Sequence, residues 1–590
     1  MQLILFNDIK EVKKLNLVTL KINNKEITVE SGTTILNAAK KLNIKIPTLC
    51  YLNLHSCNEE NKPGSCRICL VEVEGRRNLA PACCTNVTPG MVVLTNTPRV
   101  ISARKTILEL ILSNHPMECL TCQKNLNCEL QELAQVYGIR EIKYQGSKTP
   151  SFMETLSPSI VRDTSKCILC RRCVAVCNKV QGVGAIGAIN RGFETTVSTA
   201  FFEDLNDSPC TLCGQCINVC PTGALVEKDN TFEVAEAIGN KDKFVIVQTA
   251  PAVRAALGEE FGLKEGAVTA KMTAALKALG FDKVYDTDFA ADLTIMEEAT
   301  EFLERFKSGK NLPMITSCCP GWINFIEKHY NEYLNLPSTC KSPQQMWGAI
   351  AKTYLADKLG IPADKLIVVS VMPCVAKKTE ANRPEFSHEG IKDVDIVLTT
   401  RELGRMIRNA GIDFDSLEPA DFDSVMGKST GAGVIFGTTG GVMEAALRTA
   451  YEWITEDTLK NLDFEMVRGL TGIKEATVTI NGIDINVAVV SGLANAKYLL
   501  DNMEETAKKY HFIEVMACPG GCINGGGQPS SMSNYSLVEK RMNALYNEDK
   551  NMPLRKSHEN PEIIKLYEEF LTKPNGEKSH ELLHTHYKAK

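Results

Sequence analysis

The stretch EVMACPGGCINGGGQP, residues 514–529, sets two cysteines in a run rich in glycine and proline, where a loop is expected. Two earlier stretches have the same character, TSCCPGW at 316–322 and MPCVAK at 372–377. We interpret the three stretches as the walls of one metal site in the cleft of a large domain. Four of their thiols suit the corners of a cubane iron–sulfur cluster, whereas Cys318 is a further thiol that a cubane does not need. The four are Cys319, Cys374, Cys518 and Cys522.

All three stretches resemble the signature loops of the iron-only (FeFe) hydrogenases, most closely those of the long, multi-cluster clostridial type. The resemblance implies that the four cysteines bind a 4Fe-4S cubane. It also implies that Cys522 bridges to a di-iron unit with carbonyl, cyanide and azadithiolate ligands, so that cubane and di-iron unit form an H-cluster. The reaction implied is the reversible reduction of protons to molecular hydrogen.

The same resemblance assigns residues around the H-cluster. It places Lys377, three residues after Cys374, to donate to a cyanide ligand. Relatives often carry serine where Ala252 stands, so hydrogen bonding around the site is expected to differ here. The residues that pack against the carbonyls or form the remaining wall are Met372, Met516, Phe436, Gln344, Pro251 and Ala252.

A buried site that consumes protons needs a path for them. Cys318 suits the inner end, because a thiolate can accept a proton and pass it on. Glu298, Glu301 and Arg305 stand at positions i, i+3 and i+7 of a predicted helix, hence on one face. Spacing alone favours an ordinary solvated helix face. The resemblance, which adds Ser338, favours a proton path through all five residues.

Length and composition predict a multidomain protein with internal metal sites. The chain has 590 residues, whereas single hydrophobic cores rarely exceed roughly 300. Its 23 cysteines cluster at spacings that bridge a metal more readily than they form disulfides. No export signal and no apolar run of membrane-spanning length are visible, so we expect a cytoplasmic protein without a membrane span. The net charge of −5 argues against nonspecific nucleic-acid binding.

Residues 1–98 are predicted to form a ferredoxin-like domain. Apolar and polar residues alternate over 17–30 around an Asn-Asn pair, which predicts a β-hairpin, and residues 33–43 predict a capped helix. Cys57 and Cys84 remain alternative ligands, because the loop in this region is long. The preferred set resembles the ligands of a plant-type 2Fe-2S cluster: Cys50, Cys66, Cys69 and Cys83.

Residues 99–145 begin with a predicted helix at 100–113 and continue with a set of three cysteines and one histidine. Zinc is the generic interpretation of such a set. Its position between two ferredoxin-like segments favours iron, and it resembles the His-ligated 4Fe-4S site of hydrogenases and of the large iron–sulfur subunit of respiratory complex I. A neutral histidine in place of a thiolate is expected to alter the cluster potential. The four ligands are His115, Cys119, Cys122 and Cys128.

Residues 146–228 carry the spacing C-x2-C-x2-C-x3-C twice, which is typical of bacterial two-cluster ferredoxins. In that pattern the fourth cysteine of each repeat crosses to the other cluster. With the two clusters above, the chain is predicted to carry one 2Fe-2S and three accessory 4Fe-4S clusters. One 4Fe-4S cluster is assigned to Cys167, Cys170, Cys173 and Cys220, and the other to Cys210, Cys213, Cys216 and Cys177.

Residues 229–590 alternate helical patterns with short apolar runs such as 244–248 and 366–371. We therefore expect an α/β catalytic domain of two lobes around a buried metal site. The glycine-rich run at 431–441 lacks the strand and acidic partner of a dinucleotide fingerprint, so we expect it to allow close backbone packing. Two longer helices are predicted at 294–307 and 344–358.

Electrons are expected to pass to a protein carrier, ferredoxin or flavodoxin, rather than to bound nicotinamide. Residues 1–100 carry 13 Lys or Arg against 8 Asp or Glu, which is a weak indication of an acidic partner; a solvated surface is the simpler explanation. Hydrogenase maturation proteins are further expected partners, with H2 and protons as substrates. Cys340 has no assigned role. Five histidines are expected to be structural or exposed: His511, His558, His580, His584 and His586.

Three other functions are compatible with parts of the sequence. A complex I-like or formate dehydrogenase-like subunit explains the chain only to about residue 226 and does not predict the three loops. An assembly protein related to the hydrogenases is expected to lack Cys318 and parts of the cyanide-binding loop around Lys377, and both residues are present. A hydrogen sensor, or another iron–sulfur protein of the same family that does not turn over, is the alternative function.

Overall fold

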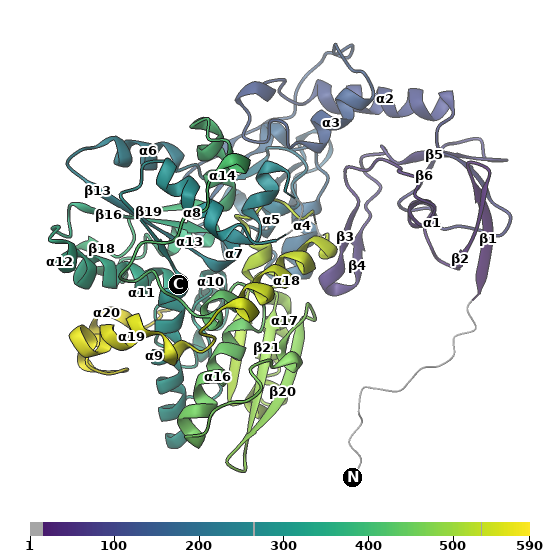
Figure 1. Cartoon of the computed structure of the whole chain (residues 1–590). Coiled ribbons are helices and arrows are strands. Elements are labelled where there is room, and N and C mark those ends of the chain that lie inside the picture. The colour runs from purple at the N-terminus through teal and green to yellow at the C-terminus, as the bar shows by residue number, and fades with distance from the viewer. Residues whose placement is uncertain (1–15, 264–265, 533) are drawn as a thin grey trace, which may run out of the picture.

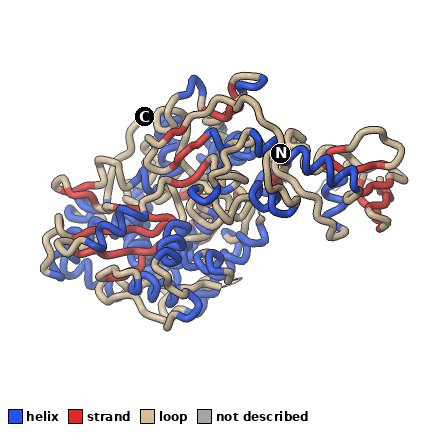
Figure 2. Tube along the Cα trace, turned by 90° about the horizontal axis from the view of Figure 1, so that it is seen from above, coloured by secondary structure: helices blue, strands red, loops and turns tan. Residues whose placement is uncertain are grey.

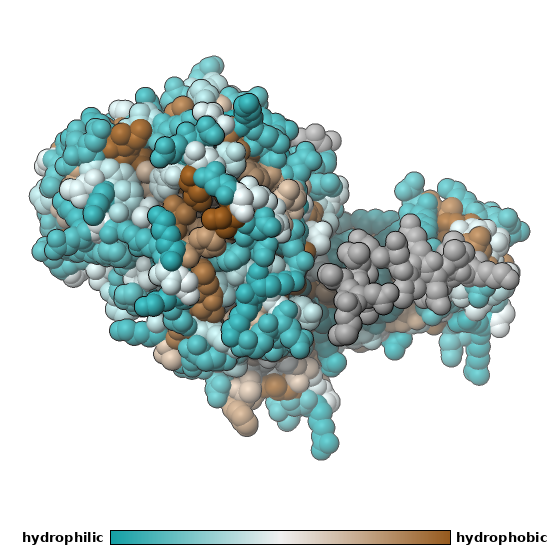
Figure 3. All heavy atoms as spheres, turned by 90° about the horizontal axis from the view of Figure 1, so that it is seen from below, coloured by the Kyte–Doolittle hydropathy of each residue, from teal (hydrophilic) through white to brown (hydrophobic). Residues whose placement is uncertain are grey.

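The computed structural model describes residues 16–263, 266–532 and 534–590 (Figure 1). Residues 1–15, the start of the predicted first domain, lie outside the described residues. A small N-terminal domain projects from a much larger body, and helix α2 (Pro98–Ser113) joins the two. Figure 2 shows the small domain at one end of the molecule. The face seen in Figure 3 is mostly hydrophilic, with apolar side chains gathered in a strip on the larger body.

The N-terminal domain packs a helix against a five-stranded sheet of order β2-β1-β7-β5-β6. The predicted hairpin is confirmed: Asn23 and Asn24 adopt φ angles of 47° and 65°, which asparagine tolerates in a two-residue turn. The predicted helix is also confirmed, with the Thr34 side chain capping its start. The elements are β1 (Leu17–Ile22), β2 (Lys25–Glu30), α1 (Ile35–Lys41), β5 (Leu70–Val73), β6 (Ala80–Pro81) and β7 (Val92–Leu94), with a separate hairpin of β3 (Leu52–Leu54) and β4 (Glu59–Asn61).

Short elements separate the cysteine-bearing loops that follow. The sheet β12-β9-β8 folds this segment back on itself, because Leu225 of β12 pairs with Arg162 of β9. That pairing returns Cys220 to the neighbourhood of Cys167. The elements are α3 (Glu129–Val136), β8 (Met153–Glu154), β9 (Ile160–Asp163), α4 (Arg172–Ala175), β10 (Gly187–Ile189), β11 (Thr196–Ser198), α5 (Gln215–Asn218) and β12 (Leu225–Glu227).

The larger body contains two four-stranded sheets, one in each lobe. The first, β14-β13-β16-β19, is parallel throughout, whereas β15-β22-β21-β20 includes one antiparallel pair, β20 with β21. Burial on both faces explains the continuous apolar runs of the sequence. The strands are β13 (Phe244–Thr249), β14 (Lys283–Asp286), β15 (Met314–Ile315), β16 (Leu366–Met372), β19 (Ile396–Thr399), β20 (Ile473–Ile480), β21 (Ile483–Ser491) and β22 (Phe512–Met516).

Alternate residues of β21 face opposite helix layers, as the two-residue period of a strand requires. Val487 and Val489 pack with α9 and α16, whereas Ala488 and Val490 pack with α10 and α17. Both predicted long helices are confirmed: 294–307 lies within α9, and 344–358 spans α11, a π turn and α12. The helices are α9 (Asp288–Ser308), α10 (Pro320–His329), α11 (Pro343–Ile350), α12 (Ala356–Leu359), α16 (Gly441–Thr455) and α17 (Leu493–Asp501).

The remaining helices cover the sheets, and the last of them lie near the C-terminus of the chain. Residues of the first sheet share one apolar core with α8 and α11 and with the segments around α14 and α19. The fold is thus the predicted α/β body behind small iron–sulfur domains. These helices are α6 (Thr231–Gly239), α7 (Pro251–Arg254), α8 (Thr269–Ala278), α13 (Ala376–Glu380), α14 (Thr400–Asn409), α15 (Gly431–Ile435), α18 (Tyr535–Asn551), α19 (Pro561–Leu566) and α20 (Glu577–Leu583).

Candidate metal centres and proton path

The loops with predicted catalytic-site residues begin where strands end. In the first lobe they follow β13 and β16, and in the second they follow β15 and β22. Parallel strands place such loops together at one edge of a sheet, which is the usual binding edge of an α/β domain. The first lobe provides Pro251, Ala252, Cys374 and Lys377, and the second provides Cys318, Cys319, Cys518 and Cys522.

The structure brings the four predicted cubane thiols together in the interior. Cys374 and Cys518 each interact with Cys319, and Cys522 interacts with both Cys319 and Cys374. Burial raises the pKa of the Cys374 thiol to about 12 and also raises the pKa values of the other three thiols. Metal binding would convert such thiols to thiolates and compensate their burial. The donor set therefore fits a cubane.

The predicted proton-path residues lie in a row that leads away from these thiols. Ser338 Oγ donates to Glu301 Oε2 at 2.7 Å, and both residues influence the pKa of neighbouring Glu298. At the outer end, half-buried Arg305 donates to Glu301 Oε1 at 2.6 Å. At the inner end, burial and then the neighbouring Glu298 raise the pKa of the Cys318 thiol. The structure thus brings all five residues together.

The solvated-face interpretation of these charges does not hold. Glu298 and Glu301 are 2% and 7% exposed, although their helix reaches the surface at its end. Burial, followed by repulsion from Glu301, raises the pKa of Glu298 to about 8. A carboxyl group that titrates near neutral pH can both accept and release a proton. Helix α9 keeps the spacing rigid, which suits a relay.

Lys377 is buried and held by a carboxylate that the sequence analysis missed. Its Nζ donates to both oxygens of Glu380 at 2.8 and 3.0 Å, and to the backbone oxygen of Cys318 at 3.1 Å. Burial opposes the charge, but Glu380 raises the pKa of Lys377 above its usual value. Gln344 also donates to Glu380, at 3.0 Å. The i, i+3 spacing of Lys377 and Glu380 was the only sequence signal for this pair.

The other predicted wall residues are buried around the same loops. Phe436 and Met516 share an apolar cluster with Cys318, and Gln528 Nε2 donates to the backbone oxygen of Ala252 at 2.7 Å. The glycine-rich run packs closely, as predicted: a Cβ on Gly437 would lie 3.2 Å from the Ala252 side chain. Buried Pro251 and Met372 lie at the strand ends of the first lobe.

The cysteines of the two-cluster segment form two separate groups, each containing the fourth cysteine of the other repeat. One cavity is lined by Cys167, Cys170, Cys173 and Cys220. In the other group, Cys177 interacts with Cys210 and Cys216. Desolvation raises the pKa values of seven of these thiols, and metal binding would compensate their burial by converting them to thiolates. The seven are Cys167, Cys170, Cys173, Cys177, Cys210, Cys213 and Cys216.

The histidine set lies beside the first of these groups. Among the residues that the structure describes, His115 Nδ1 is buried without a hydrogen-bond partner, and burial lowers the pKa of this imidazole to about 4. A neutral imidazole with an unsatisfied nitrogen fits a metal ligand. Cys119 follows four residues later in the chain, and the thiols of Cys119, Cys122 and Cys128 interact with one another.

In the N-terminal domain, Cys50 interacts with Cys66 and Cys83, and the sulfurs of Cys69 and Cys83 lie 3.4 Å apart. These are the four preferred ligands, and they fit a 2Fe-2S cluster. Cys84 also lies next to Cys83, with 3.3 Å between the sulfurs. Its side chain is exposed, however, and its thiol donates to the backbone oxygen of Lys62. Cys57 instead bonds to the Leu54 carbonyl.

The groups form a branched series that ends at the catalytic loops. Cys50 and Cys66 share an apolar cluster with Cys170, and a Cβ on Gly223 would lie 2.6 Å from Cys122 Sγ. Both outer groups therefore adjoin the group that contains Cys170 and Cys220. On the inner side, Cys213 interacts with Cys518.

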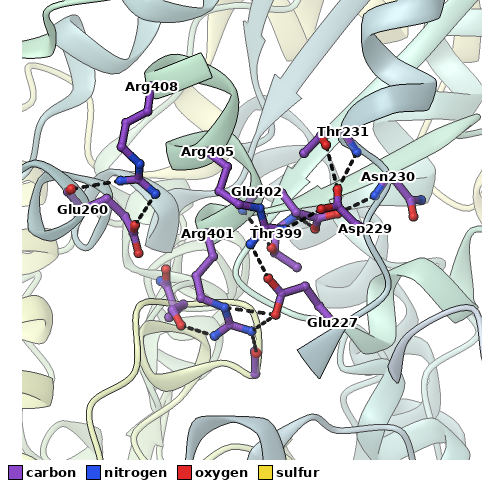
Figure 4. A network of polar contacts seen from close by, with 12 residues as sticks. Glu227, Asp229, Asn230, Thr231, Glu260, Thr399, Arg401, Glu402, Arg405 and Arg408 are labelled. Carbon is purple, nitrogen blue, oxygen red and sulfur yellow. Dashed lines mark hydrogen bonds and ion pairs between the residues drawn. The ribbon is translucent and has the colours of Figure 1, made fainter. Parts of the chain in front are cut away.

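A buried ion-pair network joins the ferredoxin-like segment to the catalytic loops (Figure 4). Arg401 donates to Glu227 Oε2 at 2.7 Å and to the Gly526 carbonyl at 2.8 Å, and Arg405 donates to Glu227 at 2.8 Å. Although burial acts in the opposite direction, the two arginines hold the pKa of Glu227 well below its usual range. Removing one partner of such a buried pair costs about 3–5 kcal/mol, so the network fixes the two regions together.

Models of known protein families match successive segments of the chain. Family models match residues 16–98 as a 2Fe-2S iron-sulfur cluster binding domain and 104–143 as the NADH-ubiquinone oxidoreductase-G iron-sulfur binding region. Residues 157–226 match the ferredoxin-like domain of NADH-quinone oxidoreductase subunit 3. Residues 243–526 match the iron only hydrogenase large subunit, C-terminal domain, and 535–590 match the iron hydrogenase small subunit.

The fold and the cysteine groups define an iron–sulfur protein with several clusters and a buried, cysteine-lined catalytic pocket. The chain is 57% identical to the NADP-reducing hydrogenase subunit HndD of Solidesulfovibrio fructosivorans, over 97% of this chain and 99% of the relative. It is 42% identical to iron hydrogenase 1 of Clostridium pasteurianum, over 97% and 100%. The chain belongs to the iron-only hydrogenase family, in its long, multi-cluster form with accessory iron–sulfur domains and an H-cluster domain.

A solved structure of a FeFe-hydrogenase from Chlamydomonas reinhardtii matches at 44% identity with a TM-score of 0.56, covering 61% of this chain and 99% of that one. The similarity therefore concerns about three fifths of the chain. In the part of the chain that the structure describes, every helix is too short or too polar to cross a membrane.

Proposed function

We propose that the protein catalyses the reversible reduction of protons to molecular hydrogen. The observation that carries this proposal is the buried row of polar groups that runs from Cys318 through Glu298 and Ser338 to Glu301 and leads directly away from a pocket of four thiols. An electron-transfer protein has no need of such a row. An H-cluster in this pocket would supply the site at which two protons and two electrons combine.

The chain's own residues would hold that group and manage its protons. The residues proposed to bind the cubane are Cys319, Cys374, Cys518 and Cys522. Lys377, fixed by Glu380, keeps an ammonium group in the pocket that suits a cyanide nitrogen. Around it, Met372, Met516 and Phe436 would exclude water, and Cys318 would exchange protons with Glu298.

Electrons would reach the pocket through the branched series of cysteine groups. We assign a 2Fe-2S cluster to the N-terminal domain, a His115-ligated 4Fe-4S cluster to residues 99–145, and two 4Fe-4S clusters to residues 146–228. The catalytic domain comprises residues 229–590. The group that contains Cys213 would deliver electrons, because it interacts with Cys518.

The proposed electron carrier is ferredoxin or flavodoxin. A second candidate is a partner subunit that reacts with NADP, because the 57% identical relative is named as a subunit of an NADP-reducing hydrogenase. In this chain the glycine-rich run forms helix α15 and tight packing around it rather than a strand–turn–helix nucleotide loop. Under H2, the purified chain should therefore reduce ferredoxin but not NADP. Direct reduction of NADP by the chain alone would contradict this assignment.

The function is tested by hydrogen evolution from reduced methyl viologen, with protein made without oxygen alongside hydrogenase maturation proteins. Only the matured protein should evolve hydrogen, and an unmatured sample is the control. Infrared bands of bound carbonyl and cyanide without turnover would instead favour the hydrogen-sensing alternative. In that case the proposed activity would be wrong, although the cluster assignment would stand.

A further inference from the structure

A buried histidine from the C-terminal segment lies beside the outer end of the proposed proton path. His584 follows helix α20 and is only 9% exposed. One of its ring nitrogens, the Cys340 thiol and a carboxylate oxygen of Glu301 all lie within 4.8 Å of one another. Its Nδ1 is 2.8 Å from the Thr339 hydroxyl, and the backbone N–H of Thr339 donates to Glu301 at 3.1 Å. A single water molecule can span a separation of this size.

Arg305, the outermost residue of the path, is poorly suited to carry protons. A guanidinium group stays protonated at physiological pH. Arg305 also uses its hydrogens to hold Glu301 at 2.6 Å and the backbone oxygens of Leu336 and Pro337 at 2.9 and 3.0 Å. It anchors Glu301, whereas an imidazole takes up and releases protons near neutral pH.

The contacts of His584 identify Nδ1 as the ring nitrogen that lacks a hydrogen in the neutral ring. Its Nε2 lies 3.2 Å from Glu297, whose buried carboxylate also accepts hydrogen bonds from Tyr567 at 2.5 Å and from the Asn575 backbone at 2.7 Å. Since a carboxylate only accepts, Nε2 carries the hydrogen and Nδ1 accepts from Thr339 in the neutral ring. A proton accepted at Nδ1 then gives an imidazolium whose Nε2 still donates to Glu297.

A second histidine connects this group to solvent. His580 is one helical turn earlier on α20, is exposed, and has its ring centre 4.3 Å from that of His584. The charged groups that face His580 are His584 and three carboxylates of α9, those of Glu297, Glu301 and Glu304. Burial and the neighbouring His584 lower the pKa of His580, and the carboxylates oppose this shift.

We propose that His584 is the outer proton-relay residue of the path, passing protons between Glu301 and solvent through His580. The inference rests on the proposed function. During hydrogen evolution, the His584 imidazolium gives one proton to the Glu301 carboxylate, and the neutral ring regains one from solvent. Hydrogen oxidation reverses both transfers, and no electron moves in either. The C-terminal segment would thereby take part in turnover.

The test compares matured, full-length wild type with His584→Gln in hydrogen evolution from reduced methyl viologen. Glutamine keeps a donor near Glu297 but does not titrate. Turnover should fall about tenfold or more, with a larger solvent deuterium isotope effect, and added imidazole should restore part of it. Carbonyl and cyanide infrared bands should be unchanged. His558→Gln is the matched control, because that histidine bonds Thr449 and Glu452 away from the path.

His580→Gln, at the surface, keeps the test decisive if His584→Gln does not fold. It should lower turnover most at low buffer concentration, where solvent carries protons poorly. Wild-type turnover in both variants would overturn the inference and leave the proposed function intact. The inference would also be overturned if His584→Gln lost turnover, imidazole restored none of it, and the solvent deuterium isotope effect stayed at the wild-type value. That pattern indicates a structural role. A matured wild type without hydrogen evolution would overturn the proposed function, and this inference with it.

Discussion

The two-cluster segment at 167–220 and the catalytic loops both gather four cysteines, but they do so by different means. In the first, three of each set of four ligands lie within seven residues, so a short chain already brings them close. In the second, four ligands span more than 200 residues and are carried by strands of two different sheets. Local spacing organises the first site, whereas the packing of two lobes organises the second.

This difference predicts how each region responds to change. Loss of one cysteine in the two-cluster segment should remove one cluster and leave the remainder. The catalytic pocket instead depends on buried polar groups that link its loops, such as Glu380 and the Arg401–Glu227 pair. A change there should alter chemistry or stability without necessarily removing the metal.

The largest expected effect is that of Cys318→Ala. Because this thiol is the inner end of the path and not a proposed metal ligand, turnover should fall about 10²–10⁴-fold while the carbonyl and cyanide bands persist. Hydrogen evolution and infrared spectra of the matured variant measure the two properties. Cys57→Ala is the control, since its thiol bonds the Leu54 carbonyl in the N-terminal domain, away from the proton path. Wild-type rates in Cys318→Ala would remove this residue from the mechanism.

The next effect concerns Glu298→Gln. Turnover should again drop strongly, but the sharper test is stability against pH. Between the usual carboxyl pKa of 4.5 and about 8, folded Glu298 holds a proton that the unfolded chain releases, so the wild type loses stability as pH rises. The wild type loses on the order of a few kcal/mol of unfolding free energy at most in this way, whereas Glu298→Gln, which does not titrate, loses none of it.

The difference in Tm, variant minus wild type, should therefore grow from about pH 5 to about pH 8 and then level off. Thermal scans of the matured proteins over this range provide the measurement. Glu304→Gln, on the exposed side of the same helix, should show no such trend. A constant difference for Glu298→Gln would mean that the carboxyl is already ionised in the folded protein.

A smaller effect is expected when the crossed cysteines are exchanged for serine. Cys220→Ser should lose the cluster of the Cys167 group, and Cys177→Ser that of the Cys210 group, with about four irons fewer in each case. Turnover with viologen should suffer less in Cys220→Ser, because the Cys210 group adjoins the catalytic loops. Iron analysis and electron paramagnetic resonance distinguish the two losses. Loss of the Cys210-group signal in Cys220→Ser would show that the ligands do not cross.

The mildest change is His115→Cys. A fourth thiolate should keep the cluster but lower its reduction potential, because the ligand set gains a negative charge. Redox titration followed by electron paramagnetic resonance measures the shift, with the other clusters as internal references. If residues 99–145 of the wild type bind zinc instead of iron, the interpretation of the histidine and three cysteines as a zinc site would be correct.

Much of this protein could be predicted from its sequence, because residues that are close together in the chain stay close together in the folded structure. Closely spaced cysteines, the Asn23-Asn24 hairpin and the apolar runs of β13 and β16 each depend on neighbours in the chain. The same holds for the helical spacing of Glu298, Glu301 and Arg305. Family resemblance added the roles of the distant cysteines, which spacing alone does not reveal.

The tertiary structure decided which distant groups meet. Lys377 reaches the backbone oxygen of Cys318 in the other lobe, and Arg401 ties the ferredoxin-like segment to the Cys522 loop. His584 reaches Glu301 from nearly 300 residues away in the chain. None of these contacts has a local pattern, because each forms only when lobes and terminal segments pack. Burial then changes the chemistry as well, turning a helix face that looked solvated into a row of proton-binding groups.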